Sequence, residues 1–273
     1  MNLYKELSQG EKILTPSSTS PRLDALLLLS YATGKSREAI LAETDREMST
    51  PERNCYRDFL HRRLNFEPIA YIQNGKQFYN LDITVDSRVL IPRPESETLV
   101  DTAIESAPAN SRLVDIGTGS GCIAIAIKKH REDLEVCASD ISRAALEVAR
   151  ANATSHNTSI TFRQGDLTYP WRDKFDTIVA NLPYVPNAYR SKESLAYEPD
   201  QSLFAGEDGL DGYRRFLPLA KNILTPSGIA IIEHLPAQLD SLKLICEKNG
   251  YSIESRDDFI SILRINPQAP PRE

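Results

Sequence analysis

Four consecutive residues in the second half of the chain, Asn181-Leu182-Pro183-Tyr184, combine a side-chain amide, a backbone carbonyl and an aromatic ring. They follow an apolar run, residues 175–180, which is expected to form a buried strand. An asparagine at a strand end is most often a turn residue, so the tetrapeptide alone indicates no chemistry. What it can do depends on the groups that neighbouring elements bring to the same place.

A glycine-rich segment, residues 114–121 with the sequence VDIGTGSG, lies between an expected strand and an expected helix. Three of the 12 glycines of the chain fall in this segment, where a ligand can lie against bare backbone at a helix N-terminus. The Gly-x-Gly-x-Gly spacing departs from the Gly-x-Gly-x-x-Gly fingerprint of dinucleotide-binding proteins. The carboxylate of Asp115 also suits a ligand with an ammonium group better than one with a pyrophosphate.

Two more aspartates stand at the ends of the next two expected strands. Asp140 can hold both hydroxyls of a ribose, and Asp166 can accept from an adenine amino group with Leu167 against the ring. Each aspartate alone is more often a cap or turn residue, but at successive strand ends of a parallel sheet they outline one adenosine-shaped site. The pattern favours S-adenosylmethionine (AdoMet) as cofactor. The predicted cofactor-binding residues are Asp115, Gly117, Thr118, Gly119, Ser120, Gly121, Asp140, Asp166, Leu167 and Asn181.

With a methyl donor beside it, the tetrapeptide gains a chemical meaning. It is similar to the (Asn/Asp)-Pro-Pro-(Tyr/Phe) signature of methyltransferases that act on planar, amide-like nitrogens. The Asn181 side-chain oxygen and the Leu182 carbonyl could hold the two hydrogens of such a nitrogen, while Tyr184 packs on its flat face. We therefore expect Asn181, Leu182, Pro183 and Tyr184 to bind substrate and to catalyse by positioning and polarisation, with no metal.

The elements that must position these residues form two patterns. Helix signals dominate the first 72 residues, which predicts a helical substrate-docking domain over 1–72. Alternating apolar residues around Asp86-Ser87 predict a β-hairpin linker over 73–94. From 95 to 273, strands and helices alternate, which predicts an α/β domain with a mostly parallel seven-stranded sheet and an antiparallel last strand. The expected strands are 112–116, 135–139, 159–163, 175–180, 229–233, 251–256 and 260–265, and the expected helices of this domain are 97–106, 122–130, 142–154, 212–224 and 237–248.

The composition narrows the range of partners. The net charge of the 273 residues is -6, which argues against a surface that binds DNA phosphates. The 4 cysteines are scattered, and the 4 histidines show no metal-ligand spacing. The longest early apolar run is too short to cross a membrane, and no signal peptide is visible. We expect a cytoplasmic protein, without membrane or direct DNA contact, that acts as a monomer.

At this point the chain resembles HemK/PrmC-type peptide chain release factor N5-glutamine methyltransferases over nearly its whole length. The matching segments include two stretches that are more specific than the glycine loop, which many AdoMet enzymes share. They read LIPRPESE at 90–97 and YEP at 197–199. Further matches are SPRLDA at 20–25, EPIAYI at 67–72, LFAG at 203–206, DGL at 208–210 and IEH at 232–234.

The resemblance implies a Rossmann-like class I AdoMet-dependent methyltransferase with a small N-terminal helical domain that grips a release factor. It implies methyl transfer to the glutamine of the Gly-Gly-Gln motif of class 1 release factors, with N5-methylglutamine and S-adenosylhomocysteine as products. The family usually has proline where this chain has Leu182. The carbonyl that would accept from the substrate is retained, but without the ring the loop is expected to be less rigid.

Other functions remain open from the sequence. A ribosomal-protein glutamine methyltransferase would use the same motif, and so would a nucleic-acid amino methyltransferase acting on adenine N6 or guanine N2. The acidic composition speaks against the latter. A nicotinamide oxidoreductase is disfavoured by the glycine spacing. A non-catalytic AdoMet-binding module is disfavoured by the intact tetrapeptide.

Overall fold

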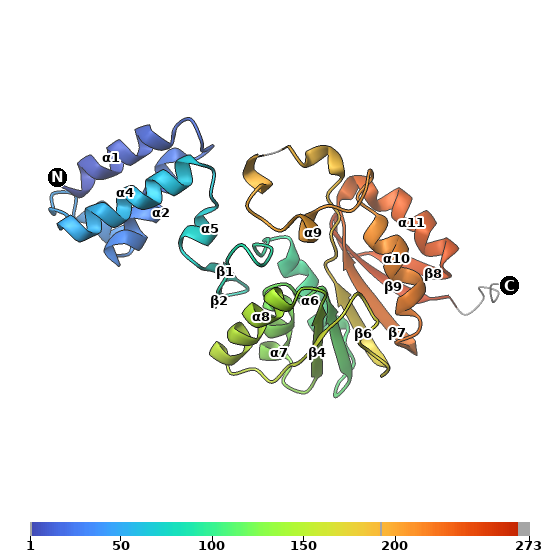
Figure 1. Cartoon of the computed structure of the whole chain (residues 1–273). Coiled ribbons are helices and arrows are strands. Elements are labelled where there is room, and N and C mark those ends of the chain that lie inside the picture. Colours follow the sequence, from blue (N-terminus) through green and yellow to red (C-terminus); the bar gives the residue numbers. More distant parts are fainter. Residues whose placement is uncertain (1, 192, 267–273) are drawn as a thin grey trace. The chain divides into compact units, whose positions relative to one another are not determined.

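The computed structural model describes residues 2–191 and 193–266, and it divides them into two compact units (Figure 1). The smaller unit comprises the described residues up to Gly75 together with 193–197. The larger unit comprises 76–191 and the described residues from Glu198 onward. The predicted site residues all belong to the larger unit.

The smaller unit is helical, as predicted. Sequence signals set its helix ends: Ser49 forms a capping box with Glu52 at one start, and Gly34 ends another helix in the left-handed conformation at φ 66°. Leu7, Leu28 and Tyr56 are among the buried residues that join these helices. The helices are α1 (Leu3–Leu14), α2 (Pro21–Thr33), α3 (Arg37–Ala42), α4 (Thr50–Leu64) and α5 (Ile69–Ile72). The short 3-10 helix η2 (Glu193–Leu195) also belongs to this unit, although it comes much later in the sequence.

A short hairpin opens the larger unit, but its turn is not the predicted one. Strands β1 (Lys76–Phe78) and β2 (Leu81–Ile83) pair antiparallel around Tyr79 and Asn80, whose φ angles are 51° and 58°. The predicted turn at Asp86-Ser87 joins no strands, so that prediction was wrong.

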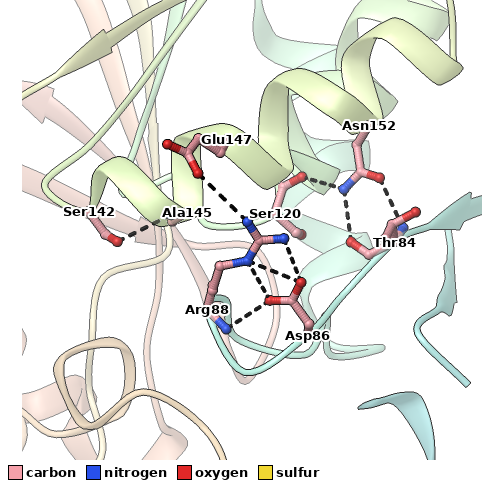
Figure 2. A network of polar contacts seen from close by, with 8 residues as sticks. All are labelled: Thr84, Asp86, Arg88, Ser120, Ser142, Ala145, Glu147 and Asn152. Atoms are coloured by element: carbon pink, nitrogen blue, oxygen red, sulfur yellow. Dashed lines mark hydrogen bonds and ion pairs between the residues drawn. The ribbon is translucent and has the colours of Figure 1, made fainter. Parts of the chain in front are cut away.

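The physical reason lies in the partners of the following segment. Both backbone groups of Thr84 bond to the side chain of Asn152, with Thr84 N donating to Oδ1 at 3.0 Å and Nδ2 donating to Thr84 O at 2.9 Å (Figure 2). Val85, Val89 and Ile91 are buried, so the apolar alternation there reflects packing and not strand pairing.

The predicted seven-stranded sheet is present, in the order β5-β4-β3-β6-β7-β9-β8. The five strands from β5 to β7 are parallel, and β9 runs antiparallel to both of its neighbours. The bounds are β3 (Arg112–Ile116), β4 (Glu135–Asp140), β5 (Thr161–Gln164), β6 (Phe175–Ala180), β7 (Leu224–Glu233), β8 (Tyr251–Ser255) and β9 (Ile260–Ile265).

Helices cover both faces of the sheet (Figure 1). The helices α6 (Ser96–Ser106), α7 (Cys122–His130) and α8 (Arg143–Ser155) form one layer. Two others, α10 (Asp211–Ala220) and α11 (Leu239–Lys248), share a core with the opposite face. The expected helix over 212–224 ends early because Leu224 already pairs with Phe175 as the start of β7. Short helices complete the unit: η1 (Asn187–Tyr189), α9 (Asp200–Leu203) and η3 (Pro236–Gln238).

The strand order reverses between β3 and β6. From β3 the chain moves outward to β4 and β5, and it then returns to β6 on the other side of β3. Open α/β sheets bind ligands at the carboxyl ends of the strands at such a reversal. Because Ile116 and Ala180 are paired there, the glycine loop and the tetrapeptide emerge side by side.

All four cysteines are free, and Cys122, Cys137 and Cys246 are buried whereas Cys55 is exposed. No helix within the described part of the chain is long and apolar enough to cross a membrane.

Candidate active site

A cavity of about 530 Å³ opens at the carboxyl ends of the central strands, a volume typical of a small-molecule site. Its lining comes from four strand ends, those of β3, β4, β5 and β6, from the segment before α6 and from the residues around α9 and α10. Eight of the predicted residues line it: Gly117, Gly119, Asp140, Asp166, Leu167, Asn181, Leu182 and Pro183. Asp115, Thr118, Ser120, Gly121 and Tyr184 do not line the cavity.

The first half of the glycine loop presents backbone to the cavity. Gly117 and Gly119 have φ angles of 78° and 54°, and a Cβ on Gly119 would meet no atom within 4 Å. Gly119 N donates to Asp140 Oδ2 at 2.9 Å, and Ser142 N donates to Oδ1 at 2.8 Å. These bonds orient the Asp140 carboxylate, and burial raises its pKa. The arrangement fits a ribose held by a carboxylate beside bare backbone.

The second half of the loop is fixed to α8 and does not face the cavity. A Cβ on Gly121 would lie 3.1 Å from Ala149 Cβ, so glycine is needed here for helix packing. Ser120 O accepts from Asn152 Nδ2 at 2.9 Å, and the same side chain binds Thr84 (Figure 2). Asn152 thus ties the loop to the segment that carries Arg88, which lines the cavity.

Asp115 supports the loop from below. Its Oδ2 accepts from Thr118 Oγ1 at 2.6 Å, whereas no described residue donates to its buried Oδ1. Burial raises the pKa of Asp115 to about 7, against the opposing effect of the Thr118 bond. Asp115 itself is 1% exposed and does not line the cavity, so the carboxylate acts on the loop and does not face a ligand directly.

The third aspartate already has a cationic partner. Asp166 Oδ2 accepts a hydrogen bond from Arg215 on α10, and both residues line the cavity. Leu167, in the left-handed conformation at φ 49°, packs on the core beneath. Asp166 therefore sits where the sequence placed it, and an adenine amino group would share its carboxylate with Arg215.

Asn181 is held by its amino end. Its Nδ2 donates to Ser96 Oγ at 3.0 Å and to Glu233 Oε2 at 3.1 Å. No donor from residues 2–191 or 193–266 reaches Asn181 Oδ1 or the Leu182 carbonyl. The two acceptors that the sequence assigned to substrate thus lie unengaged in residues that line the cavity.

Glu233 is fully buried and also accepts from Tyr184 Oη, which donates to Oε1 at 2.8 Å. Burial raises the pKa of Glu233, while hydrogen bonds from Ser96, Tyr184 and Asn181 act in the opposite direction. Burial and the Glu233 charge raise the pKa of Tyr184, so its phenol stays protonated. Tyr213 Oη donates to the Glu233 backbone carbonyl and fixes the strand end.

The rest of the tetrapeptide is anchored by packing and by one glutamine. The Leu182 side chain is 4% exposed and belongs to the core formed with α10. Gln238 Nε2 donates to the carbonyls of Tyr184 and Asp208, at 2.8 Å each. A Cβ on Gly209, whose φ is 77°, would strike the Tyr184 carbonyl. This close approach explains the glycine at position 209.

A buried ion pair ties the segment after the tetrapeptide to the segment before α6. Glu198 accepts hydrogen bonds from Arg93 and from Ile91 N, the latter at 3.0 Å. The Glu198 side chain is 2% exposed, so the pair is shielded from water on one side. The two most specific sequence segments, around residues 90–97 and 197–199, therefore meet through this contact.

Several site residues had no role assigned from the sequence: Ser96, Glu198, Tyr213, Arg215, Glu233 and Gln238. A usable signal existed for Glu233, because a carboxylate directly after the apolar run at 229–232 is unusual for a buried strand. The other partners depend on the strand order and on loop paths, which the sequence does not display.

Comparisons with known proteins cover both units. The PrmC N-terminal domain family matches residues 6–73, and the Methyltransferase small domain family matches residues 94–197. A Release factor glutamine methyltransferase from Coxiella burnetii is 36% identical over 267 residues, which cover 96% of this chain and 95% of that protein. Another of the same name, from Neisseria gonorrhoeae, is 36% identical and covers 91% and 93%.

Solved structures share the fold of the larger unit. A methyltransferase from Pyrococcus furiosus superposes with a TM-score of 0.52 at 22% identity, covering 76% of this chain and 96% of that one. A ribosomal protein L11 methylase from Lactobacillus delbrueckii gives a TM-score of 0.50 at 21% identity, covering 66% and 83%. The sheet and helices described above are therefore those of a class I methyltransferase.

Proposed function

Since the chain belongs to the release factor glutamine methyltransferase family, we propose that it methylates the side-chain amide nitrogen of a glutamine in a peptide chain release factor, with AdoMet as methyl donor. The observation that carries the proposal is the pair of unengaged acceptors, Asn181 Oδ1 and Leu182 O, beside the glycine loop. A primary amide offers two N–H donors on one planar nitrogen to such a pair.

The substrate amide nitrogen needs help because its lone pair is delocalised into the carbonyl. Two hydrogen bonds from its N–H groups, to Asn181 Oδ1 and Leu182 O, polarise the amide and fix its direction of attack. Tyr184 does not line the cavity, and its part in this assignment is to hold the tetrapeptide through its bond to Glu233. No base has to act before methyl transfer, because the nitrogen becomes acidic once it is alkylated.

AdoMet supplies an electrophilic methyl group on a sulfonium centre. In the proposed assignment, Gly117 and Gly119 present backbone to it, Asp140 holds the ribose, and Asp166 with Leu167 receives the adenine. Asp115 contributes indirectly, because it does not line the cavity and holds Thr118 of the glycine loop through its Oδ2. The mechanism asks these residues only to bind and orient.

The finer identity of the substrate is also proposed. The acceptor is the glutamine of the Gly-Gly-Gln motif of class 1 release factors, and the product is N5-methylglutamine. The smaller unit docks the release factor, and the chain acts as a cytoplasmic monomer without direct DNA contact. The support is the near full-length similarity to relatives that carry both units.

The test is methylation of a purified class 1 release factor with labelled AdoMet. We expect mass spectrometry to find one methyl group on the Gly-Gly-Gln glutamine, and none on a release factor with alanine at that position. As a matched control, Asn181→Ala should bind AdoMet with little change by calorimetry but lose transfer. Label on a ribosomal protein or RNA, with an unmodified release factor, would overturn the proposal.

A further inference from the structure

We propose that Glu233 is the positioning residue that decides which end of the Asn181 amide faces the substrate. The inference rests on the proposed function, because it concerns how the acceptor oxygen is presented. An asparagine amide can turn about its terminal bond, and only one of its two orientations accepts a hydrogen bond from a glutamine. A neighbouring group in the site must therefore stabilise one of the two orientations.

The sheet places the two residues together. Ala180 at the end of β6 pairs with Ile232 on β7, so that Asn181 and Glu233 are the next residues on neighbouring parallel strands. Ser96 comes from the first turn of α6 and completes the group. Glu233 is 0% exposed and Ser96 is 2% exposed, so water does not compete for these bonds.

The donors and acceptors around Asn181 permit only one orientation of its side-chain amide. Asn181 Nδ2 has two hydrogens, and its two partners are Glu233 Oε2 at 3.1 Å and Ser96 Oγ at 3.0 Å. A carboxylate only accepts, so the amino end must face Glu233. With both hydrogens used, Asn181 Oδ1 is turned away toward the cavity, where no described residue donates to it.

Ser96 alone would not decide the orientation, because a hydroxyl can donate as well as accept. Ser96 also acts on Glu233, since it lowers the pKa of that carboxyl against the effect of burial. A carboxylate can only accept, so a Ser96 hydroxyl that turns its hydrogen toward Glu233 offers Asn181 an oxygen lone pair alone. Glu233 therefore sets the direction of both bonds to Nδ2.

The same carboxylate also holds the aromatic ring. Tyr184 Oη donates to Oε1 at 2.8 Å, so Asn181 and Tyr184 of the tetrapeptide share one buried partner. The strand end itself is fixed by Tyr213 and by His234, whose Nε2 lies 2.8 Å from Ser261 Oγ. With both oxygens engaged by protein groups, Glu233 positions other residues and does not act as a base.

The experiment is a double-mutant cycle on the full chain with a class 1 release factor as substrate. The single variants are Glu233→Gln and Asn181→Asp, and the double variant combines them. Asn181→Asp sets two carboxylates against each other, and we expect kcat to fall about a hundredfold. Glu233→Gln leaves a single acceptor oxygen for two donors, Asn181 Nδ2 and Tyr184 Oη, and we expect kcat to fall about tenfold.

The double variant provides the decisive readout. The amino end of the glutamine can donate to the aspartate at position 181, whose second oxygen then faces the substrate as an acceptor. We expect its kcat to exceed that of Asn181→Asp by about tenfold, a coupling that a merely structural role would not produce. Calorimetry should show AdoMet affinity within about twofold of wild type in all three variants.

Two further variants distinguish a lost orientation of the Asn181 amide from a general loss of stability. Ser96→Ala removes one acceptor but leaves Glu233, and its kcat should fall only about threefold. Ser261→Ala loosens the same strand end through His234 and should lower the midpoint of thermal unfolding while kcat is kept.

The inference is overturned if Glu233→Gln keeps the wild-type kcat, or if the double variant is no more active than Asn181→Asp. It is also overturned if Ser96→Ala loses as much activity as Glu233→Gln. Should Glu233→Gln prove unstable, the pH dependence of Asn181→Asp still discriminates, because protonation of one of the two facing carboxylates restores a donor between them. Orientation by Glu233 predicts that the kcat of Asn181→Asp relative to wild type rises as the pH falls, and a constant ratio overturns the inference. A wild-type protein that leaves the release factor unmethylated would instead refute the proposed function.

Discussion

At the residue scale, Leu182 shows how a departure from the family pattern is accommodated. The absence of the proline ring was expected to loosen the loop. In the structure, the Leu182 side chain is buried in the core with Ile116, Leu210 and Tyr213. Side-chain packing therefore holds the position that a ring would otherwise stiffen.

This account predicts the effect of restoring the proline. Leu182→Pro removes buried side-chain volume and the backbone N–H together, so we expect the free energy of unfolding to fall by about 2 kcal/mol. Chemical denaturation measures the change. Leu182→Met conserves the volume and should cost less than about 1 kcal/mol. A more stable proline variant would show that the ring contributes more than the packing does.

At the element scale, the chain between β6 and α10 forms one wall of the cavity through Pro199, Gln201 and Phe204. That wall begins directly after Glu198, whose buried carboxylate binds Arg93 and Ile91 N. The ion pair joins residues 105 positions apart in the sequence. A long loop can therefore keep a defined path without a strand or a long helix of its own.

We predict that Glu198→Ala lowers the free energy of unfolding by about 3 kcal/mol, because Arg93 and the Ile91 N–H lose a buried partner. The same variant should weaken AdoMet binding, since the cavity wall is no longer held. Asp200 offers the control: its pair with Arg190 leaves 68% of the Asp200 side chain exposed, so Asp200→Ala should cost less than about 1 kcal/mol. Denaturation and calorimetry give both quantities, and equal losses in the two variants would contradict the assigned role.

At the scale of the whole molecule, chemistry and docking are assigned to different units. Every residue of the cavity lies in the larger unit. The smaller unit has a groove of its own, about 260 Å³, between α1 and α4. Its lining mixes the apolar Ile13, Leu60 and Leu64 with the charged Arg57, a composition suited to a protein surface.

If the smaller unit docks the release factor, an exposed residue of this groove should affect substrate binding alone. We predict that Arg57→Glu raises KM for the intact release factor several-fold and leaves kcat and AdoMet affinity unchanged. Steady-state kinetics with a short Gly-Gly-Gln peptide provides the control, because a peptide that contacts only the cavity should show no change. A lower kcat with both substrates would argue against a separate docking role.

Local sequence determined much of this protein. The glycine loop and the polar residues at the ends of β3, β4 and β6 were readable because each depends on backbone geometry within a few residues. The alternation of strands and helices is likewise a pattern of local sequence, and it predicted the sheet and its antiparallel end. The hairpin turn was misplaced because burial of Val85 and Val89 imitates the pattern of a strand.

Only the tertiary structure decided how the candidate site is held. Asn181 meets Glu233 and Ser96 across 52 and 85 residues of sequence, and Asp166 meets Arg215 across 49. Those meetings follow from the strand order and from helix packing, which depend on how the whole core fills space and not on any local preference. The sequence named Asn181 as the residue for the chemistry, and the fold around β6 and β7 turned its oxygen toward the cavity.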